Sequence, residues 1–283
     1  MVQIIECPRD AMQGIHQFIP TADKVRYINA LLKVGFHTLD CGSFVSPRYI
    51  PQMQDTAKVL NEIDLTGSHS KLSVIVANVR GAEEACQHEN VTYLGFPFSI
   101  SETFQLRNTN ATIEQSLHTV EAIKATCEKA GKQLVVYLSM AFGNPYDDPW
   151  DIDVAGKWID RLSEMDIRYV SLSDTIGVAT PEVITYFFRD LTRHFPQMDF
   201  GAHFHTTPET WREKVEPAYK NGCNRFDGAI KGFGGCPMAK DDLVGNMPTE
   251  RLVEYFEEQG VATGLNREAF FEAMQIALEV FPH

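Results

Sequence analysis

The sequence predicts an α/β fold, a (β/α)8 TIM barrel with an additional C-terminal helix. Three observations lead to this prediction. Short apolar segments rich in β-branched residues recur about eight times, helical patterns lie between them, and no proline- or glycine-rich linker separates the units. A chain of 283 residues, 44% hydrophobic and 22% charged, can also bury the large core of such a barrel. We therefore expect one catalytic domain over residues 1–283.

The expected strands share a short apolar run and a polar or glycine-containing segment after it. Each is long enough for one barrel strand and is followed by a longer helical pattern. They cover residues 3–7, 37–42, 72–77, 92–97, 134–140, 169–173, 200–205 and 225–230.

The expected helices are identified by apolar residues repeating every three or four positions. Residues 21–34 place Val25, Ile28 and Leu31 on one face, and residues 112–129 form an amphipathic run that begins at Thr112. After the eighth strand, residues 249–259 predict the closing helix, and residues 266–280 predict the C-terminal helix that covers the barrel. The competing architecture is a doubly wound open sheet. Its glycine-rich GxGxxG turn after the first strand is missing, which favours the barrel.

Charge and cysteine usage exclude several classes of protein. A formal net charge of -13 argues against a general binder of nucleic acid or of anionic membranes. No apolar run approaches the roughly 20 residues of a membrane span, and the first residues do not resemble a signal segment. The six cysteines are scattered, which is typical of free thiols in a reducing compartment. We expect a cytoplasmic protein without nucleic-acid or membrane partners.

Polar residues end several expected strands, where TIM barrels carry their chemistry. Arg9 and Asp10 follow the first strand, Asp40 lies in the second and Asp174 ends the sixth. Each has a structural alternative: Arg9 and Asp10 can be a solvated surface pair, and either aspartate can cap the following helix.

His203 and His205 in the seventh strand are two residues apart and therefore share a face directed to the barrel mouth. Together with oxygen donors from Asp10 and Asn246 they form a mixed nitrogen and oxygen set. Such a set suits Mg²⁺, Mn²⁺ or Zn²⁺ without distinguishing them. The alternative is that the histidines are satisfied polar residues at a rim.

The run Gly232-Phe233-Gly234-Gly235-Cys236-Pro237, followed by Gly245-Asn246, predicts a shaped loop that presents a thiol. Glycine permits positive φ and close approach, and proline restricts the backbone. A flexible surface loop with an incidental cysteine is the alternative.

These motifs, with Ser43-Phe44-Val45-Ser46-Pro47, Pro51-Gln52-Met53 and Asp174-Thr175-Ile176-Gly177, resemble the 3-hydroxy-3-methylglutaryl-CoA lyase family from the first strand to the closing helix. The resemblance implies divalent-metal-dependent cleavage of 3-hydroxy-3-methylglutaryl-CoA to acetyl-CoA and acetoacetate. It implies an acyl-CoA partner, a homodimer and Mg²⁺ or Mn²⁺ before Zn²⁺. Metal ligands would be Asp10, His203, His205 and Asn246.

The resemblance also implies roles for the other residues. Arg9 would stabilise an enolate oxygen, and Cys236 would give the proton to the acetyl carbon under a closed loop. Asp174 or His203 would be the base for the hydroxyl, and Asp40 would belong to the catalytic set. The expected substrate contacts are Gln13, Ser43, Gly235 and Lys231. Lys231 could meet a CoA phosphate or a substrate carboxylate, and the favoured alternative is a solvated lysine.

The sequence departs from the family pattern near the expected site. The run after Asp10 is Ala11-Met12-Gln13-Gly14-Ile15-His16 where the family usually has Gly-Leu-Gln-Asn-Glu-Lys, Asp40 replaces a glutamate, and Thr206-Thr207 replaces Asp-Thr. Two alternatives therefore stay open. One is a lyase or synthase of the same barrel group that acts on another 3-hydroxyacyl-CoA or a 2-oxo acid, and the other is a non-catalytic paralogue that binds a metal and CoA esters.

Overall fold

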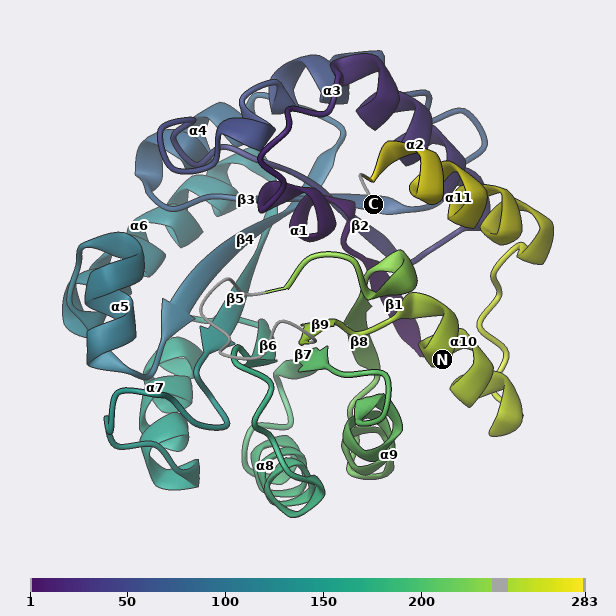
Figure 1. Ribbon diagram of the computed structural model, residues 1–283. Coiled ribbons are helices and arrows are strands. Elements are labelled where there is room, and N and C mark those ends of the chain that lie inside the picture. Colours follow the sequence, from purple (N-terminus) through teal and green to yellow (C-terminus); the bar gives the residue numbers. More distant parts are fainter. Residues whose placement is uncertain (1, 236–243, 282–283) are drawn as a thin grey trace.

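Eight parallel strands close into a barrel, seen along its axis in the computed structural model of Figure 1, which describes residues 2–235 and 244–281. Each strand from β1 to β8 pairs with the next along the chain, and β1 pairs with β8 to complete the ring. The predicted TIM barrel is confirmed.

The eight barrel strands start and end within two residues of their predicted limits. A short ninth strand, β9, runs antiparallel to β7. The strands are β1 Gln3–Glu6, β2 Thr38–Ser43, β3 Lys71–Ile75, β4 Val91–Ser99, β5 Gln133–Ser139, β6 Tyr169–Asp174, β7 Asp199–Thr206, β8 Arg225–Gly228 and β9 Gly245–Asn246.

Helices surround the barrel and bury their apolar faces against the strands (Figure 1). They are α1 Pro8–Gln13, α2 Thr21–Val34, α3 Thr56–Glu62, α4 Val79–Cys86, α5 Glu102–Thr109, α6 Ile113–Ala130, α7 Ile152–Glu164, α8 Pro181–His194, α9 Trp211–Lys220, α10 Thr249–Glu258 and α11 Arg267–Val280, with 3-10 turns at Pro51–Met53 and Ile230–Gly232. Among the described residues, no helix combines the length and the apolar character needed to cross a membrane.

The C-terminal helix covers the outside of the barrel beside α2, as predicted (Figure 1). Asn266 does not lie in α11 but caps it, because its side chain accepts a hydrogen bond from the Ala269 N–H at 3.1 Å. Two edge-to-face contacts, Tyr27 with Phe281 and Phe36 with Phe270, hold α11 and the residue after it against the α2 region.

Three local predictions differ from the structure. Strand β1 ends at Glu6, so Arg9 and Asp10 lie on the short helix α1 with Pro8 in its first turn. Strand β8 ends at Gly228 rather than at residue 230, since the chain turns there into a 3-10 segment. Asp40 does not cap a helix, because it lies inside β2.

A buried carboxyl group joins the two ends of the segment that carries the glycine-rich loop. Glu6 accepts hydrogen bonds from the Ile230 N–H at 2.9 Å and from the Thr249 hydroxyl. Gly228 permits this approach, because a Cβ there would lie 2.7 Å from the Thr249 hydroxyl oxygen. Burial raises the pKa of Glu6 to about 8, although both hydrogen bonds oppose the rise. Ile230 and Thr249 are thereby held at one point of the barrel wall.

Candidate metal and catalytic site

Asp10, His203 and His205 converge at the end of the barrel where the strands terminate. One potential ligand atom from each lies within 4.8 Å of the others. Asp10 comes from α1, directly after β1, and both histidines come from β7, where alternate residues point to the same face. The sequence-based grouping of these three residues is therefore realised in the fold.

Two ligand atoms of this group have no protein partner among the described residues. They are Asp10 Oδ2 and His205 Nε2, and both are buried. The other ring nitrogen of His205, Nδ1, donates to the Thr175 carbonyl at 2.8 Å, which leaves a lone pair on Nε2. Buried polar atoms without partners are costly, and a divalent cation would satisfy both. The residues present thus fit a metal ion.

Asn246 reaches the group because β9 pairs with β7, with Asn246 directly opposite His205. Its Nδ2 donates to the Phe233 carbonyl at 2.8 Å, and its side chain helps to lower the pKa of Asp10. Gly234 packs against both residues: a Cβ there would lie 2.6 Å from the Asp10 carbonyl oxygen and 2.9 Å from Asn246 Nδ2. The first described part of the glycine-rich loop therefore borders the site.

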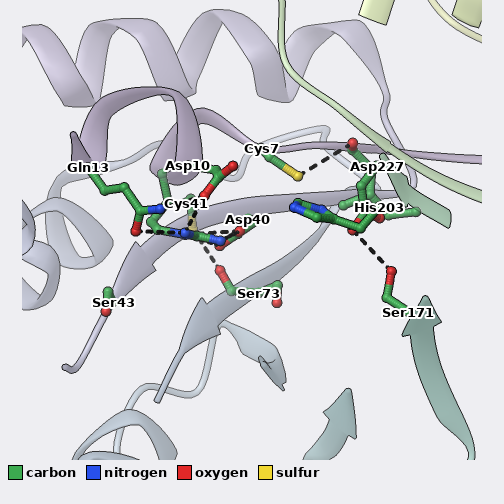
Figure 2. A network of polar contacts seen from close by, with 12 residues as sticks. Cys7, Asp10, Gln13, Asp40, Cys41, Ser43, Ser73, Ser171, His203 and Asp227 are labelled. Atoms are coloured by element: carbon green, nitrogen blue, oxygen red, sulfur yellow. Dashed lines mark hydrogen bonds and ion pairs between the residues drawn. The ribbon is translucent and has the colours of Figure 1, made fainter. Parts of the chain in front are cut away.

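Arg9 is held in place by three side chains. Its Nε donates to Asp40 Oδ2 at 3.0 Å and its Nη2 donates to the same carboxylate, while Nη1 donates to Asp10 at 2.7 Å and to Gln13 at 2.9 Å. Gln13 also donates to Asp10, at 2.6 Å. Figure 2 shows Gln13, Asp10 and Asp40 on one side of this network and His203 with Asp227 on the other. The guanidinium is thus rigid before any ligand arrives.

The charges around Asp10 keep it ionised. Burial alone would raise the pKa of Asp10, but the positive charge of Arg9, followed by that of His203, outweighs burial and lowers the pKa to about 2. Burial and the charge of His203 lower the pKa of His205, which favours the neutral imidazole that binds metals.

Asp227 positions His203 and was missed in the sequence. Its Oδ2 lies 3.0 Å from His203 Nδ1 and accepts from the Ser171 hydroxyl at 3.4 Å (Figure 2). This contact directs the other ring nitrogen, Nε2, away from Asp227. The available signal was an acidic residue in the middle of the apolar eighth strand, since a buried charge needs a partner.

Asp174 is held by contacts that the sequence did not reveal. It is buried, pairs with Lys214 Nζ at 2.6 Å, and accepts from the backbone N–H groups of Val178 and Ala179. Lys214 Nζ also donates to the carbonyls of Gly177 and His205 at 2.9 Å each. The pair ties the loop after β6 to β7 and supports Thr175, whose carbonyl orients His205.

The expected substrate contacts lie in different surroundings. Gln13 braces Arg9 and Asp10, whereas the buried Ser43 hydroxyl accepts from the Val45 N–H at 3.1 Å. Lys231 is exposed, and its backbone N–H donates to Glu250. Gly235 has φ of 128° and lies against the Val244 carbonyl.

Cys236 lies outside the described residues. The thiol placed near Arg9 and Asp227 belongs to Cys7, which is buried. Burial, followed by the charges of Asp227 and Asp40, raises the pKa of Cys7 well above its ordinary value. Cys7 is therefore a poor source of thiolate.

Comparison with known proteins assigns almost the whole chain to the family that its motifs resemble. A protein-family profile described as HMGL-like matches residues 2–276. The protein belongs to the HMGL-like family. It is 32% identical over 269 residues to the hydroxymethylglutaryl-CoA lyase of Bacillus subtilis, with 94% of this chain and 88% of that protein covered. The mouse mitochondrial hydroxymethylglutaryl-CoA lyase is 31% identical, with 96% of this chain and 83% of the mouse protein covered.

Solved structures of family members share the fold closely. The Bacillus subtilis HMG-CoA lyase superimposes with a TM-score of 0.92 at 31% identity, covering 99% of this chain and 93% of that one. An HMG-CoA lyase from Acinetobacter baumannii in complex with coenzyme A and 3-methylmalate has a TM-score of 0.90 at 28% identity, covering 99% and 91%. The recognition of the family from motifs is confirmed.

Proposed function

We propose that residues 1–283 form one catalytic barrel that cleaves 3-hydroxy-3-methylglutaryl-CoA to acetyl-CoA and acetoacetate with a divalent cation. One observation carries the proposal: Asp10 and His205 direct unpartnered buried ligand atoms into one cluster beside a braced Arg9, in a chain of the HMGL-like family. Relatives of similar length are named HMG-CoA lyases, which supports the same substrate here.

Asp10, His203, His205 and Asn246 would hold the ion, and their oxygen and imidazole donors suit Mg²⁺ or Mn²⁺, with Zn²⁺ the less favoured choice. When bound, such an ion acts as a Lewis acid that lowers the pKa of a substrate hydroxyl. Asp10, kept ionised by its surroundings, supplies negative charge to the ion.

Arg9 would stabilise the negative charge that develops on the thioester oxygen. The hydrogen bonds of Arg9 leave one Nη2 hydrogen without an acceptor among the described residues. Because Asp40 and Gln13 already fix the guanidinium, this donor needs little reorganisation during the reaction. Asp40 would thus act by positioning Arg9, and Gln13 by bracing Arg9 and Asp10.

His203 and Asp174 remain the candidate bases for the hydroxyl proton, and the contacts favour His203. Asp174 is occupied by Lys214 and two backbone N–H groups, whereas His203 belongs to the cluster and contacts Asp227 through Nδ1, which leaves Nε2 for the site. Nε2 can hold the ion or take the proton, but not both at once. The Mn²⁺ affinity of His203→Gln, measured separately from its turnover, distinguishes the two uses.

Cys236 would donate the proton to the acetyl carbon. Gly234 and Gly235, which precede it, lie against the Asp10 carbonyl and Val244, and this supports delivery of the next residue to the site. Ser43, Gly235 and Lys231 stay proposed substrate contacts, with Lys231 exposed and available to an anionic group of CoA. We also propose a cytoplasmic homodimer; the five described cysteines are free, which supports a reducing compartment.

The test is acetoacetate release from 3-hydroxy-3-methylglutaryl-CoA by purified protein with Mg²⁺ or Mn²⁺. We expect Cys236→Ala to lose about 10²- to 10⁴-fold in turnover, the usual range for removal of a general acid, with unchanged metal affinity. The matched control is Cys86→Ala, on the outer helix α4. No release with either ion would refute the substrate, and equal turnover of Cys236→Ala and the parent would remove Cys236 from the mechanism.

A second candidate function is cleavage of a different hydroxyacyl-CoA. It is favoured by the structure of a family member bound to coenzyme A and 3-methylmalate, and by Asp40, one methylene shorter than the glutamate of the family pattern. Assays with a panel of short hydroxyacyl-CoA esters and a 2-oxo acid distinguish the candidates. Binding of the esters without turnover would instead indicate a non-catalytic paralogue.

A further inference from the structure

A buried arginine lies inside the barrel at the end where the strands begin, opposite to the metal group. Arg225 is the first residue of β8, and the alternation of side chains along a strand gives it the same inward face as Asp227. Only 8% of Arg225 is exposed. It is a buried charge that the candidate catalytic site does not use.

The guanidinium of Arg225 has no acidic partner among the described residues. Its Nη1 is buried and has no hydrogen-bond partner there. The acid on the same face of β8, Asp227, contacts His203 instead. Asp199, at the start of the neighbouring strand β7, pairs with Arg168 at 3.0 Å. A buried cation without a counterion is costly, so a ligand that brings negative charge is favoured at Arg225.

Two tyrosine rings hold this guanidinium. Its Cζ lies 4.8 Å from the centre of the Tyr169 ring and 5.8 Å from the centre of the Tyr93 ring. The two rings meet edge to face, with their centres 5.5 Å apart. Cation–π contacts offset part of the cost of the buried charge, but the N–H groups at the edge of the guanidinium still need acceptors. Arg225 is therefore fixed in place with donors to spare.

A second cation contacts the same tyrosine. Lys71, the first residue of β3, is exposed, and its Nζ donates to the Tyr93 hydroxyl at 3.3 Å and lies 5.6 Å from the centre of the Tyr93 ring. Since this hydroxyl accepts from Lys71, its own hydrogen stays free for another acceptor. Burial, followed by the charges of Lys71 and Arg225, lowers the pKa of His37 to about 4, as expected where positive charge gathers. This end of the barrel is therefore locally positive.

Arg225 also lines a cavity of about 380 Å³ at this end of the barrel. Gln3 and Asn224 add polar side chains to its lining, and the acid that lines it is Asp199, which is paired with Arg168. Sites for small molecules in proteins usually measure about 300–1,000 Å³. The cavity thus has room for a charged group and a small organic part.

We propose that Arg225 and Lys71 form a binding site for the phosphate group of a small metabolite at the end of the barrel where the strands begin. The guanidinium fork of Arg225 would hold two phosphate oxygens, and Lys71 would supply the second positive charge. A phosphate monoester carries about 1.5 to 2 negative charges at pH 7, so two cations favour it over a singly charged carboxylate. The site is separate from the metal group, which lies where the strands end.

The test is calorimetric titration of the full-length protein with inorganic phosphate, and with acetate at equal ionic strength, in the absence of divalent metal. We expect saturable binding of phosphate that is tighter than that of acetate. Arg225→Gln should weaken phosphate binding by about 10- to 100-fold, the usual effect of removing a charged hydrogen bond. Lys71→Gln, at an exposed position, should weaken it as well. Arg193→Gln, an exposed arginine in the last turn of α8, is the matched control and should bind like the parent.

Three results would overturn the proposal. The first is that the parent shows no saturable binding of phosphate, and the second is that acetate binds as tightly as phosphate. The third is that Arg225→Gln and Lys71→Gln bind phosphate like the parent, which would place the anion elsewhere, such as at Arg9. If Arg225→Gln does not fold, Lys71→Gln and Arg225→Lys, which keeps the charge but loses the fork, decide in its place. The measurement needs no turnover, so it stands apart from the test of the proposed lyase activity.

Discussion

At the scale of single residues, the site depends on partners that lie far away in the chain. Arg9 is braced by Asp40, 31 positions later, and His203 by Asp227, 24 positions later. The residue types and the spacing of His203 and His205 are local signals, and they predicted that these two side chains lie together with Asp10. The bracing contacts have no such local signal, because they depend on which strands become neighbours.

Asp227→Asn should disturb His203 while leaving the barrel intact. The carboxylate fixes the imidazole through Nδ1, and loss of such a contact typically costs about 10- to 100-fold in metal affinity or activity. Steady-state kinetics and Mn²⁺ titration would measure both quantities. Asp199→Asn, an exposed aspartate paired with Arg168, is the matched control. Parental kinetics and Mn²⁺ affinity in Asp227→Asn would contradict a positioning role.

At the scale of elements, Glu6 links β1 to both ends of the segment that contains β9. Ile230 precedes the glycine-rich loop, and Thr249 begins α10. The register of β9 on β7 then places Asn246 opposite His205. Helix and strand positions were predicted well because apolar periodicity is local. The role of Glu6 was not predicted, since nothing near it in the sequence indicates that a strand carboxyl group meets residues more than 220 positions away.

The raised pKa of Glu6 makes stability depend on pH in a defined direction. The pKa is about 8 in the folded protein against an ordinary value of 4.5. As pH rises from about 5 to 8 the unfolded chain releases this proton first, so the contribution of Glu6 to stability falls over this window. Each pKa unit corresponds to about 1.4 kcal/mol, so the loss can reach several kcal/mol.

Glu6→Gln should remove this dependence, because an amide keeps the shape of the protonated acid and does not ionise. We expect urea unfolding to show the variant gaining stability relative to the parent between about pH 5 and pH 8. Glu83→Gln, an exposed glutamate on α4, is the control and should follow the parent. If the unfolding free energies of Glu6→Gln and the parent changed in parallel with pH, Glu6 would not titrate in this window.

At the scale of the whole molecule, the barrel brings Asp10 from its first β/α unit next to His203 and His205 from its seventh strand. Closure between β1 and β8 makes this possible. A cation that binds this folded arrangement, and not the unfolded chain, stabilises the whole barrel by mass action.

Mn²⁺ should therefore raise the thermal midpoint in a concentration-dependent way. His205→Gln should lose most of this rise, because it removes a buried ligand atom that has no described protein partner. His194→Gln, an exposed histidine on α8, should keep the full rise. Differential scanning calorimetry across a Mn²⁺ series measures the effect, and an equal rise in both variants would place Mn²⁺ binding elsewhere.

The sequence by itself determined the number and order of β/α units, the family and the set of ligand types. The units follow from apolar periodicity, and the family is recognised by resemblance in motifs such as Arg9-Asp10 and the alternating His203 and His205, each of which spans only a few residues. The tertiary structure alone decided that Asp40 and Gln13 hold Arg9, that Asp227 orients His203, and that Lys214 neutralises Asp174. The physical reason is that a buried charge must find its partner across the closed barrel, and the partner is chosen by strand register and barrel closure rather than by nearby sequence.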